Sequence, residues 1–313
     1  MSLHPIMNYI HTARYVNLPV YAHIQSNTLT NDERFLPQRG ENLYCDGLHY
    51  CFPPHLHDAA EFLYILDGAM CIESSQKTYL ARAGELYCFN PYELHSAYIN
   101  AETPSVKYIA VTAALDAVCQ EGFPIMRQTV DAITKSKLSF RTVLSDSPAV
   151  RSAGEAMRAA AEMQDHQNTD GAAEFAIMGA LYTMLSQLIT AGALSPVGAD
   201  SAASAQFMRR VSLFIEEHYT QDITPELLFS EFPYHPNYFG RMFKAHFGKP
   251  FRSYLNDYRI KCAMELLLSG DGISMHAVAA RVGFSDYCYF SHVFKRHTGV
   301  SASEYVKLRT QRR

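Results

Sequence analysis

The sequence lacks the features of several classes of protein. It contains no Cys-x-x-Cys pair, and its seven cysteines are odd in number and have no paired spacing. The missing pair excludes zinc sites of the ribbon type, and the spacing argues against a disulfide scaffold, so we expect a reducing compartment. No basic region followed by an apolar stretch stands near residue 1, and we recognise no apolar run of membrane-spanning length. We therefore expect a cytoplasmic protein that does not engage a membrane.

Length and charge indicate two domains of different kinds. The chain has 313 residues, 48% of them hydrophobic, which suits a globular protein with more than one domain. Residues 206–313 contain 15 Lys and Arg against 10 Asp and Glu, whereas the preceding residues contain 12 against 21. A basic end joined to an acidic body is typical of a DNA-binding domain attached to a regulatory domain.

The last third of the chain contains an internal repeat. Six residues have an identical residue 51 positions later, and the pairs are Tyr238 and Tyr289, Phe239 and Phe290, Phe243 and Phe294, Lys244 and Lys295, Gly248 and Gly299, and Tyr254 and Tyr305. Six identities at one offset indicate that a supersecondary unit occurs twice.

The spacing within each copy predicts a helix-turn-helix. Residues four apart share one face of a helix, so each Phe pair stacks on one side, and the glycine that follows suits a left-handed helix stop. A short helix is expected before each copy, over 225–231 and 275–282. A helix, a tight turn and a second helix make up the helix-turn-helix layout.

The second copy resembles a known family of DNA-binding proteins. Gly283-Phe-Ser-Asp-Tyr-Cys-Tyr-Phe-Ser-His-Val-Phe-Lys-Arg-His-Thr-Gly299, followed by Ser301-x-x-Glu304-Tyr305, is similar to the second helix-turn-helix of AraC-type transcription regulators. The segment from Phe239 to Gly248 and the expected helix from Phe251 to about Leu268 resemble the first unit and its connecting helix. The resemblance covers about residues 206–310. It implies double-stranded promoter DNA as a partner, and RNA polymerase as another if the protein is an activator.

The helix-turn-helix layout predicts which side chains reach DNA. The first recognition helix should begin near His235-Pro236, with base contacts from Arg241 and Asn237 and a close approach at Gly240. The second should begin at Ser285 as N-cap, with Asp286 in its first turn. The full set of expected DNA-binding residues is Asn237, Gly240, Arg241, Lys244, Ser285, Tyr287, Cys288, His292, Lys295 and Arg296. Lys244, Lys295 and Arg296 lie later in their helices and should meet phosphate or solvent.

The first unit departs from the family pattern at its turn. Leu228 stands where the family has Ala, and Phe232-Pro233 stands at the bend where it has Gly. Pro233 can form a turn but fixes it differently from glycine, and this bears on the pose of the first recognition helix.

The residues before the repeat predict an α+β protein. Short apolar runs in residues 1–145, broken by turns such as Asp67-Gly68 and Ala83-Gly84, predict an antiparallel β barrel as a ligand-sensing domain. Residues 146–190 read as two helices, the second capped by Asp170 and running from Ala172 to about Ile189. Residues 191–205 read as a linker, and 206–313 as the all-α domain with two helix-turn-helix units.

The helices of 146–190 have two interpretations. Their apolar faces can pack against the β domain, or they can form the interface of a homodimer. AraC-type regulators often dimerise through helices that follow the sensor domain, so the resemblance favours the homodimer.

A second resemblance concerns the β domain. His55-x-His57-x-x-x-Glu61, followed by Gly68 and later by Gly84, Pro91 and His95, resembles the two motifs of the cupin family, which are small double-sheet barrels. The match is imperfect, because the leading glycine is displaced to Gly47 and Glu93 stands where the second motif has a glycine. The residues that match a cupin metal set are His55, His57, Glu61 and His95.

These groups leave three readings open. They can line a pocket for a small polar effector such as a sugar, hold a transition metal, or serve structure alone. We favour the pocket, with no required cofactor, and name as ligand-binding candidates His55, His57, Glu61, Tyr64, Arg82 and His95. The expected function is a DNA-binding transcription regulator and not an enzyme. The alternative is a metal-dependent cupin enzyme carrying a DNA-binding domain.

Overall fold

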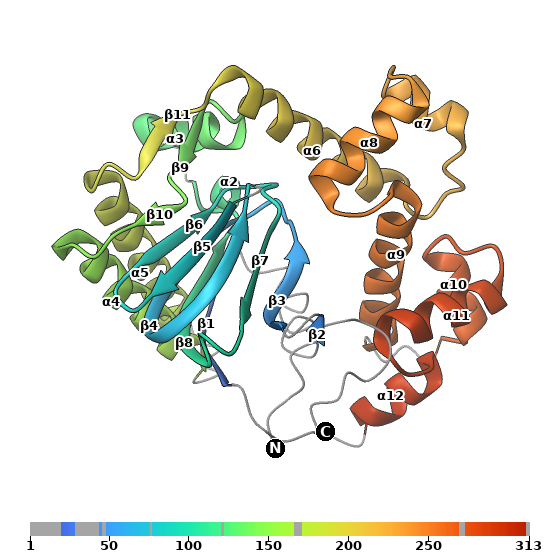
Figure 1. Cartoon of the computed structure of the whole chain (residues 1–313), viewed down its shortest axis with the longest axis horizontal. Coiled ribbons are helices and arrows are strands. Elements are labelled where there is room, and N and C mark those ends of the chain that lie inside the picture. Colours follow the sequence, from blue (N-terminus) through green and yellow to red (C-terminus); the bar gives the residue numbers. More distant parts are fainter. Residues whose placement is uncertain are drawn as a thin grey trace. The chain divides into compact units, whose positions relative to one another are not determined.

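The computed structural model describes residues 20–28, 44–45, 48–75, 77–119, 122–165, 171–268 and 273–310. The chain divides into two compact units, with the division after Arg209. Unit 1 holds the β domain and the helices that follow it, and unit 2 holds the repeat (Figure 1). Gly47 and Asp170 lie outside the described residues.

Unit 1 is built on antiparallel strands. They are β1 (Val20–Thr28), β2 (Tyr44–Cys45), β3 (Leu48–His55), β4 (Ala60–Ser74), β5 (Lys77–Arg82), β6 (Leu86–Phe89), β7 (His95–Ile99), β8 (Ser105–Ala113), β9 (Leu138–Phe140), β10 (Val143–Leu144) and β11 (Leu194–Pro196). The main sheet runs in the order β1-β8-β4-β7-β3-β2, with β5 and β6 also paired to β4. The N-terminal domain is therefore an antiparallel, sheet-rich domain, as expected.

Strand β4 joins the two halves of this sheet. Its first half pairs with β8 and β6, and its second half pairs with β5 and β7. The predicted turn at Asp67-Gly68 is wrong: the strand continues through it with a register shift between Ile65 and Asp67. Gly68 has φ +72°, and a β-carbon there would lie 2.2 Å from the carbonyl oxygen of Ser105. Glycine therefore allows a bulge that bends one long strand, where the sequence suggested two short ones.

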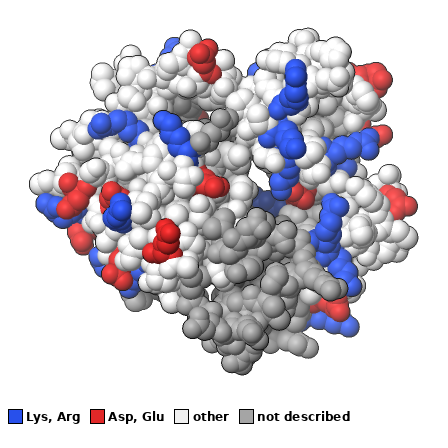
Figure 2. Space-filling view, in the orientation of Figure 1, with Lys and Arg blue, Asp and Glu red and all other residues white. Residues whose placement is uncertain are grey.

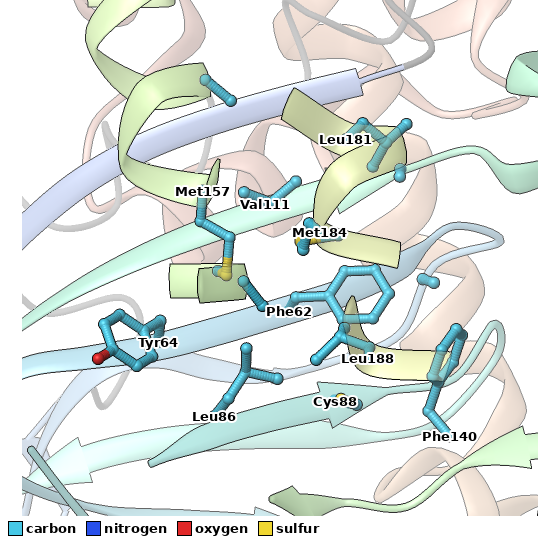
Figure 3. Close-up of a cluster of buried hydrophobic side chains, with 14 of the residues drawn as sticks. Phe62, Tyr64, Leu86, Cys88, Val111, Phe140, Met157, Leu181, Met184 and Leu188 are labelled. Atoms are coloured by element: carbon cyan, nitrogen blue, oxygen red, sulfur yellow. The ribbon is translucent and has the colours of Figure 1, made fainter. Parts of the chain in front are cut away.

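The two faces of the β4 sheet bury separate cores. Leu63, Ile65 and Phe89 belong to the core on the inner face. Phe62, Tyr64 and Leu86 belong to the outer core, which Figure 3 shows beneath helical side chains such as Leu181 and Leu188. Because neighbouring residues of a strand point to opposite faces, β4 contributes alternately to both cores.

Helices cover the outer face of the sheet. They are α2 (Leu115–Val118), α3 (Pro124–Thr134), α4 (Pro148–Asp165) and α5 (Gly171–Thr190). The β reading of residues 1–145 missed α2 and α3, both of which are short. The expected helical pair is present as α4 and α5, and Leu181, Met184 and Leu188 of α5 enter the outer core.

Helix α5 is also long and apolar. By length and composition alone, Ala172–Thr190 could cross a membrane, with a mean hydropathy of 1.3. The expectation that no segment has this property is therefore wrong. The same property occurs in helices that pack in the core of a globular domain, and α5 packs one face in this way.

The expected linker is partly ordered into regular structure. Within 191–205, β11 pairs with β9, and α6 (Ala199–His218) begins. Helix α6 continues across the division between the units, because its residues from Arg210 onward belong to unit 2.

Unit 2 follows the predicted helices closely. They are α7 (Pro225–Glu231), α8 (Pro236–Phe247), α9 (Phe251–Leu268), α10 (Met275–Arg281), α11 (Tyr287–Thr298) and α12 (Ala302–Thr310). Gly248 and Gly299 end α8 and α11 with φ of 73° and 79°, which confirms the two left-handed stops. Phe239, Phe243, Phe290 and Phe294 are buried, which confirms them as core residues.

The unusual turn of the first unit is packed by an aromatic side chain. Phe232 is fully buried, and its ring centroid lies 5.4 Å from that of Phe214 and 5.5 Å from that of Phe239. It ends α7, and Pro236 then opens α8 with His235 as N-cap, as predicted. The turn is thus held by a packed aromatic ring, at a position where the family pattern has a glycine.

Candidate functional site

Four side chains of unit 1 meet at one end of the inner core. His55 ends β3, His57 lies in the following loop, Glu61 stands near the start of β4, and His95 begins β7. His55 and His95 are partners in the β3–β7 register, with ring centroids 4.2 Å apart. One ligand atom from each of the four residues lies within 4.8 Å of all the others. We call this set the histidine cluster.

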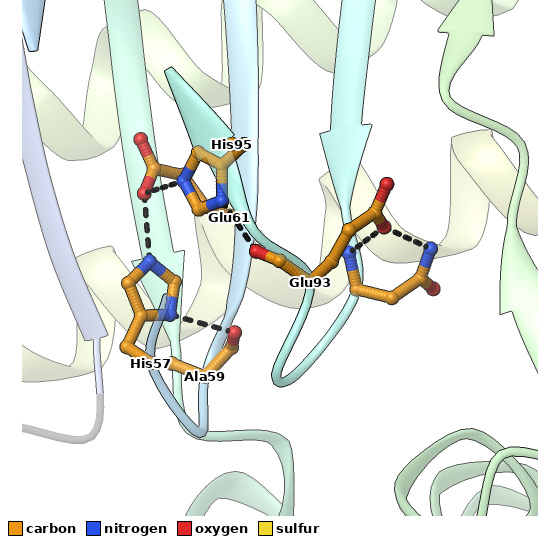
Figure 4. A network of polar contacts seen from close by, with 6 residues as sticks. His57, Ala59, Glu61, Glu93 and His95 are labelled. Carbon is orange, nitrogen blue, oxygen red and sulfur yellow. Dashed lines mark hydrogen bonds and ion pairs between the residues drawn. The ribbon is translucent and has the colours of Figure 1, made fainter. Parts of the chain in front are cut away.

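Backbone carbonyls fix the direction of two of the imidazoles. Nδ1 of His57 lies 2.9 Å from the carbonyl oxygen of Ala59, and Nδ1 of His95 lies 2.7 Å from that of Glu93 (Figure 4). A carbonyl only accepts, so each Nδ1 carries the proton and each Nε2 is directed elsewhere.

Both Nε2 atoms face the same carboxylate. Oε2 of Glu61 lies 2.9 Å from Nε2 of His57 and 3.4 Å from Nε2 of His95. The second separation is long for a hydrogen bond, and Nε2 of His95 is buried without a hydrogen-bond partner. If both imidazoles were neutral, two lone pairs would face a carboxylate. The arrangement therefore requires added protons or a cation between these atoms.

The carboxylate of Glu61 stays charged in this setting. Burial alone would raise its pKa, but the interactions with the imidazoles of His57 and His95 outweigh burial and hold the pKa well below its usual range. The two imidazoles are thus the nearest partners that the described residues give to this buried carboxylate.

The loop before His95 is held in place by the carboxylate of Glu93. Its Oε2 accepts hydrogen bonds from the backbone N–H of Asn90 and from Nδ2 of the same residue, at 2.9 and 3.0 Å. Its Oε1 accepts from the hydroxyls of Ser74 and Ser75. The residue that departs from the cupin motif therefore ties the loop to the β4–β5 hairpin.

Two expected ligand-binding residues do not join the cluster. Tyr64 lies on the opposite face of β4 from Glu61, in the outer core, where its ring would contact a β-carbon built at Gly154 of α4. Arg82 is exposed at the end of β5, opposite Ala69 in the far half of β4. Strand parity moves Tyr64 away and register moves Arg82 away, so neither side chain lies with the histidine cluster.

The structure also adds groups outside the set of ligand-binding residues named above. The ring of Phe89 stacks on His95 with centroids 4.1 Å apart and planes 8° apart. The carbonyl oxygens of Ala59 and Glu93 orient the imidazoles. Phe89 is the register partner of Glu61 across β6 and β4, and spacing along the chain does not reveal that pairing. Backbone carbonyls leave no signal in a sequence.

The first recognition helix exposes one polar face. Asn237, Gly240, Arg241 and Lys244 of α8 are all exposed, and together with Pro236 they line one open surface depression. The structure thus brings together the four residues expected to contact DNA in the first unit. On the visible side of unit 2, Figure 2 shows Lys and Arg side chains in a band that passes over α8.

The second recognition helix is similar but less basic at the reading positions. Cys288, His292, Lys295 and Arg296 of α11 are exposed, whereas Tyr287 is half-buried and stacks on His276 with centroids 3.9 Å apart.

The expected N-cap of this helix was displaced by one residue. The cap is Asp286, whose Oδ1 accepts from the backbone N–H of Tyr289 at 2.6 Å, and Ser285 stands before it. Asp and Ser are comparable caps, so the sequence did not distinguish the two positions.

Helix α9 fastens the two recognition units together. Buried Asn256 donates a hydrogen bond to the hydroxyl of Tyr289 in α11 at 2.8 Å. The carboxylate of Asp257 pairs with Lys249, which follows α8, and with His297 near the end of α11. Neighbouring residues of one helix therefore contact both ends of the second recognition helix.

Comparison with known proteins agrees with both units. Residues 44–185 match the family model described as the AraC-like ligand binding domain, and residues 228–308 match that of a helix-turn-helix domain. A crystal structure of apo ToxT from Vibrio cholerae, a Lys-to-Ala variant, covers 91% of this chain and 97% of its own, with a TM-score of 0.50 and 14% identity. At that identity the likeness concerns the fold alone.

Curated relatives match the C-terminal third. The regulatory protein PocR of Salmonella typhimurium is 32% identical over 98 residues, which is 31% of this chain and 32% of that protein. The uncharacterized HTH-type transcriptional regulator YpdC of Escherichia coli is 33% identical over 92 residues, or 29% of this chain and 32% of that protein. This chain spans between 19% and 40% of the length of the curated relatives that it matches. With a ligand-binding family domain followed by a helix-turn-helix domain, the chain belongs to the AraC-type transcription regulators.

Proposed function

We propose that this protein binds specific promoter DNA through α8 and α11, and that a small polar effector in the histidine cluster changes that binding. The observation that carries the DNA part is the pair of recognition helices, each with an exposed polar face and a buried Phe pair behind it. If the protein is an activator, RNA polymerase is a further partner.

The joining helix has a suitable length for two neighbouring major grooves. The 18 residues of α9 span roughly 27 Å at the rise of an α-helix. Successive major-groove faces lie about 34 Å apart along B-form DNA. A single chain can therefore address two consecutive grooves on one side of the duplex.

The effector part rests on the buried polar groups of unit 1. The side chain of His95 is 1% exposed and that of Glu61 is 10% exposed. Buried polar groups are costly unless hydrogen-bonded, and a hydroxylated molecule offers both donors and acceptors to the cluster. A ligand that binds the cluster more tightly in one state of the protein would shift the protein toward that state.

A selection and a screen test this proposal. Full-length protein is first used to select duplexes from a random-sequence pool. The selected duplex is then titrated with metal-free protein, in the presence of sugars and other small polar metabolites. An effector should raise the melting temperature and change the affinity for DNA, and both effects should be lost in His57→Ala. Failure to select any sequence would contradict the DNA part.

A metal ion in the histidine cluster is the second candidate, favoured by the two Nε2 atoms that face Glu61. The donors fit a transition metal, because imidazole nitrogens and a carboxylate suit Zn, Fe, Mn or Ni. In metal sites the other imidazole nitrogen commonly donates to a backbone carbonyl, as His57 and His95 do here. When bound, such an ion would supply Lewis-acid chemistry, and the alternative function is a metal-dependent cupin enzyme with a DNA-binding domain.

Metal analysis separates the two candidates. Purified protein is assayed for transition metals, and metal-free protein is then melted with Zn²⁺, Mn²⁺, Ni²⁺ or a candidate metabolite. A stoichiometric metal and a thermal shift from the ion alone, absent in His57→Ala, would favour the metal. A shift produced by a metabolite in metal-free protein would favour the effector pocket.

We also propose that the protein forms a homodimer through the outer face of α5. Only 22% of the apolar window of this helix is buried, and Phe175 is 82% exposed. Exposed Gly179 and Thr183 lie one and two turns further along the helix, so a second copy of α5 could approach closely. A twofold axis would place the same face of both copies in contact.

A further inference from the structure

The six repeated residues of unit 2 divide into two groups. Phe239 and Phe243 and their counterparts are at most 2% exposed, and Gly248 and Gly299 end their helices in the left-handed conformation. The rings of Tyr254 and Tyr305 pack on Phe243 and Phe294 at 5.8 and 5.7 Å. These identities serve the packing of two similar units.

The other two pairs are more exposed, although the ring of Tyr289 also lies beside that of Phe284, with centroids 5.9 Å apart. Tyr238 and Tyr289 are each 49% exposed, and Lys244 and Lys295 are also exposed. Folding does not require an identical exposed residue in both units. The shared side chains therefore point to a surface that both units meet in the same form.

The expected base-reading positions behave in the opposite way. At the same offset Asn237 corresponds to Cys288, and Arg241 corresponds to His292. Two units that read different bases need different residues at these positions. The DNA backbone presents the same phosphates to both units, because phosphate contacts carry no direct sequence information.

The position of the tyrosines on their helices suits this division. With 3.6 residues per turn, Tyr238 lies roughly 60° around the helix axis from Arg241 and roughly 100° from Asn237. A helix about 10–12 Å wide fills a major groove about 12 Å wide. When Asn237 and Arg241 point at the base edges in the groove floor, Tyr238 on the side of the helix faces the phosphates that line the groove.

The hydroxyl of Tyr289 is already oriented by the fold. Nδ2 of Asn256 donates to it at 2.8 Å, so the oxygen is held from the protein side and the hydroxyl keeps its own proton as a donor. The ring of Tyr238 lies beside that of Tyr234, with centroids 5.7 Å apart.

We propose that Tyr238 and Tyr289 are phosphate-binding residues, which clamp the DNA backbone in the same way in both units while Asn237, Arg241, Cys288 and His292 read different bases. The inference rests on the proposed DNA binding and deepens it. Lys244 and Lys295 lie six residues further along their helices, roughly 120° around the axis from the tyrosines, so their contacts with phosphate would be separate ones.

The test compares Tyr238→Phe and Tyr289→Phe with wild type. Phenylalanine keeps the ring and removes only the hydroxyl. Affinity is measured for the duplex that the wild-type protein selects from a random pool and for a scrambled duplex, at several salt concentrations. Tyr254→Phe is the matched control, because it makes the same change at the repeated tyrosine whose ring is packed inside the unit.

We expect each of the two substitutions to weaken binding to both duplexes by the same factor, about two- to tenfold, the scale of one hydrogen bond. The base preference and the salt dependence should not change, because no charge is removed. Lys244→Gln and Lys295→Gln should also weaken both duplexes, and each should lower the salt slope by about 0.9. Tyr254→Phe should leave affinity unchanged.

Three results would overturn the proposal. Unchanged affinity in both tyrosine variants would mean that the hydroxyls make no contact. A changed base preference would mean that the tyrosines read bases. An equal loss in Tyr254→Phe would assign the effect to folding. If the wild-type protein selects no DNA, the proposed function itself fails, which is a separate outcome.

Discussion

The guanidinium of Arg259 lies directly against Gly283. A β-carbon built at Gly283 would come within 3.0 Å of both Nε and Nη2 of Arg259 and within 2.4 Å of the carbonyl oxygen of Tyr219. Arg259 donates from Nε to that carbonyl at 2.7 Å and from Nη2 to the carbonyl of Gln221 at 2.6 Å. These hydrogen bonds join α9 to the residues that follow α6. The side chain of Arg259 fits there because Gly283 has no β-carbon.

Gly283→Ala should destabilise unit 2 by about 1–3 kcal/mol, because φ is +89° and the new methyl group would displace Arg259. Chemical denaturation of the full chain measures the change. Gly240→Ala is the control: a β-carbon there meets nothing within 4 Å, and alanine is the better helix former. Equal loss of stability in both variants would contradict the argument.

Arg241→Ala should relax the base preference at one position of the selected duplex and cost about 1–3 kcal/mol of binding, the scale of a bidentate contact to guanine. Lys295→Ala should weaken all sequences alike. Selection from a random pool, repeated with each variant, distinguishes the two effects. A preserved base preference in Arg241→Ala would mean that α8 lies in the groove in another orientation. The Phe232-Pro233 turn before α8 would then be the structural feature to examine.

Asp257→Asn should lower stability at neutral pH by at most about 1 kcal/mol, because the ion pairs are partly exposed. Burial would raise the pKa of Asp257, but hydrogen bonds from His297 and Lys249 and their charges lower it below its usual value. A carboxyl group whose pKa is lowered by folding stabilises the fold at pH values above its pKa in the unfolded chain, which is near 4. This stabilisation is lost as the pH falls through the pKa of the folded protein. The wild-type and variant stabilities should therefore converge in acid.

The control for this experiment is Asp131→Asn. Asp131 pairs with Lys135 on the exposed surface of α3, so its loss should not change stability measurably. A gap between wild type and Asp257→Asn that persists unchanged to low pH would contradict the electrostatic account.

Phe175→Glu should convert the proposed homodimer to monomers without unfolding it, because the side chain is 82% exposed. Light scattering over a range of concentrations measures the mass. Ile125→Glu, at an apolar residue of α3 that is 74% exposed, is the matched control and should leave the mass unchanged. A monomeric wild-type protein, or a dimer that survives Phe175→Glu, would contradict the proposed interface.

Sequence reasoning succeeded where the determinants are local. Helix stops at Gly248 and Gly299, the start of α8 at Pro236 and the bounds of α9 follow from residues within one turn of each feature. The repeat located the recognition helices because identical spacing produces identical units. One-residue differences, such as Asp286 in place of Ser285 as N-cap, arise where two suitable residues are adjacent.

It failed where partners are distant in the chain. Asp67-Gly68 suits a turn, yet β4 continues through it because both halves of the strand find antiparallel partners. The packing of α4 and α5 makes the Tyr64 face of β4 the outer core, which places this candidate ligand-binding residue away from the histidine cluster.

By itself, the sequence determined the family, the two helix-turn-helix units and the four members of the histidine cluster, because each depends on residue type and spacing along the chain. Only the tertiary structure decided that the imidazoles of His57 and His95 both face Glu61, and that the backbone carbonyls of Ala59 and Glu93 orient these imidazoles. It also decided that Arg259 occupies the space at Gly283. The physical reason is that strand pairing and helix packing bring these atoms together from separate segments, and backbone carbonyls are common to every residue.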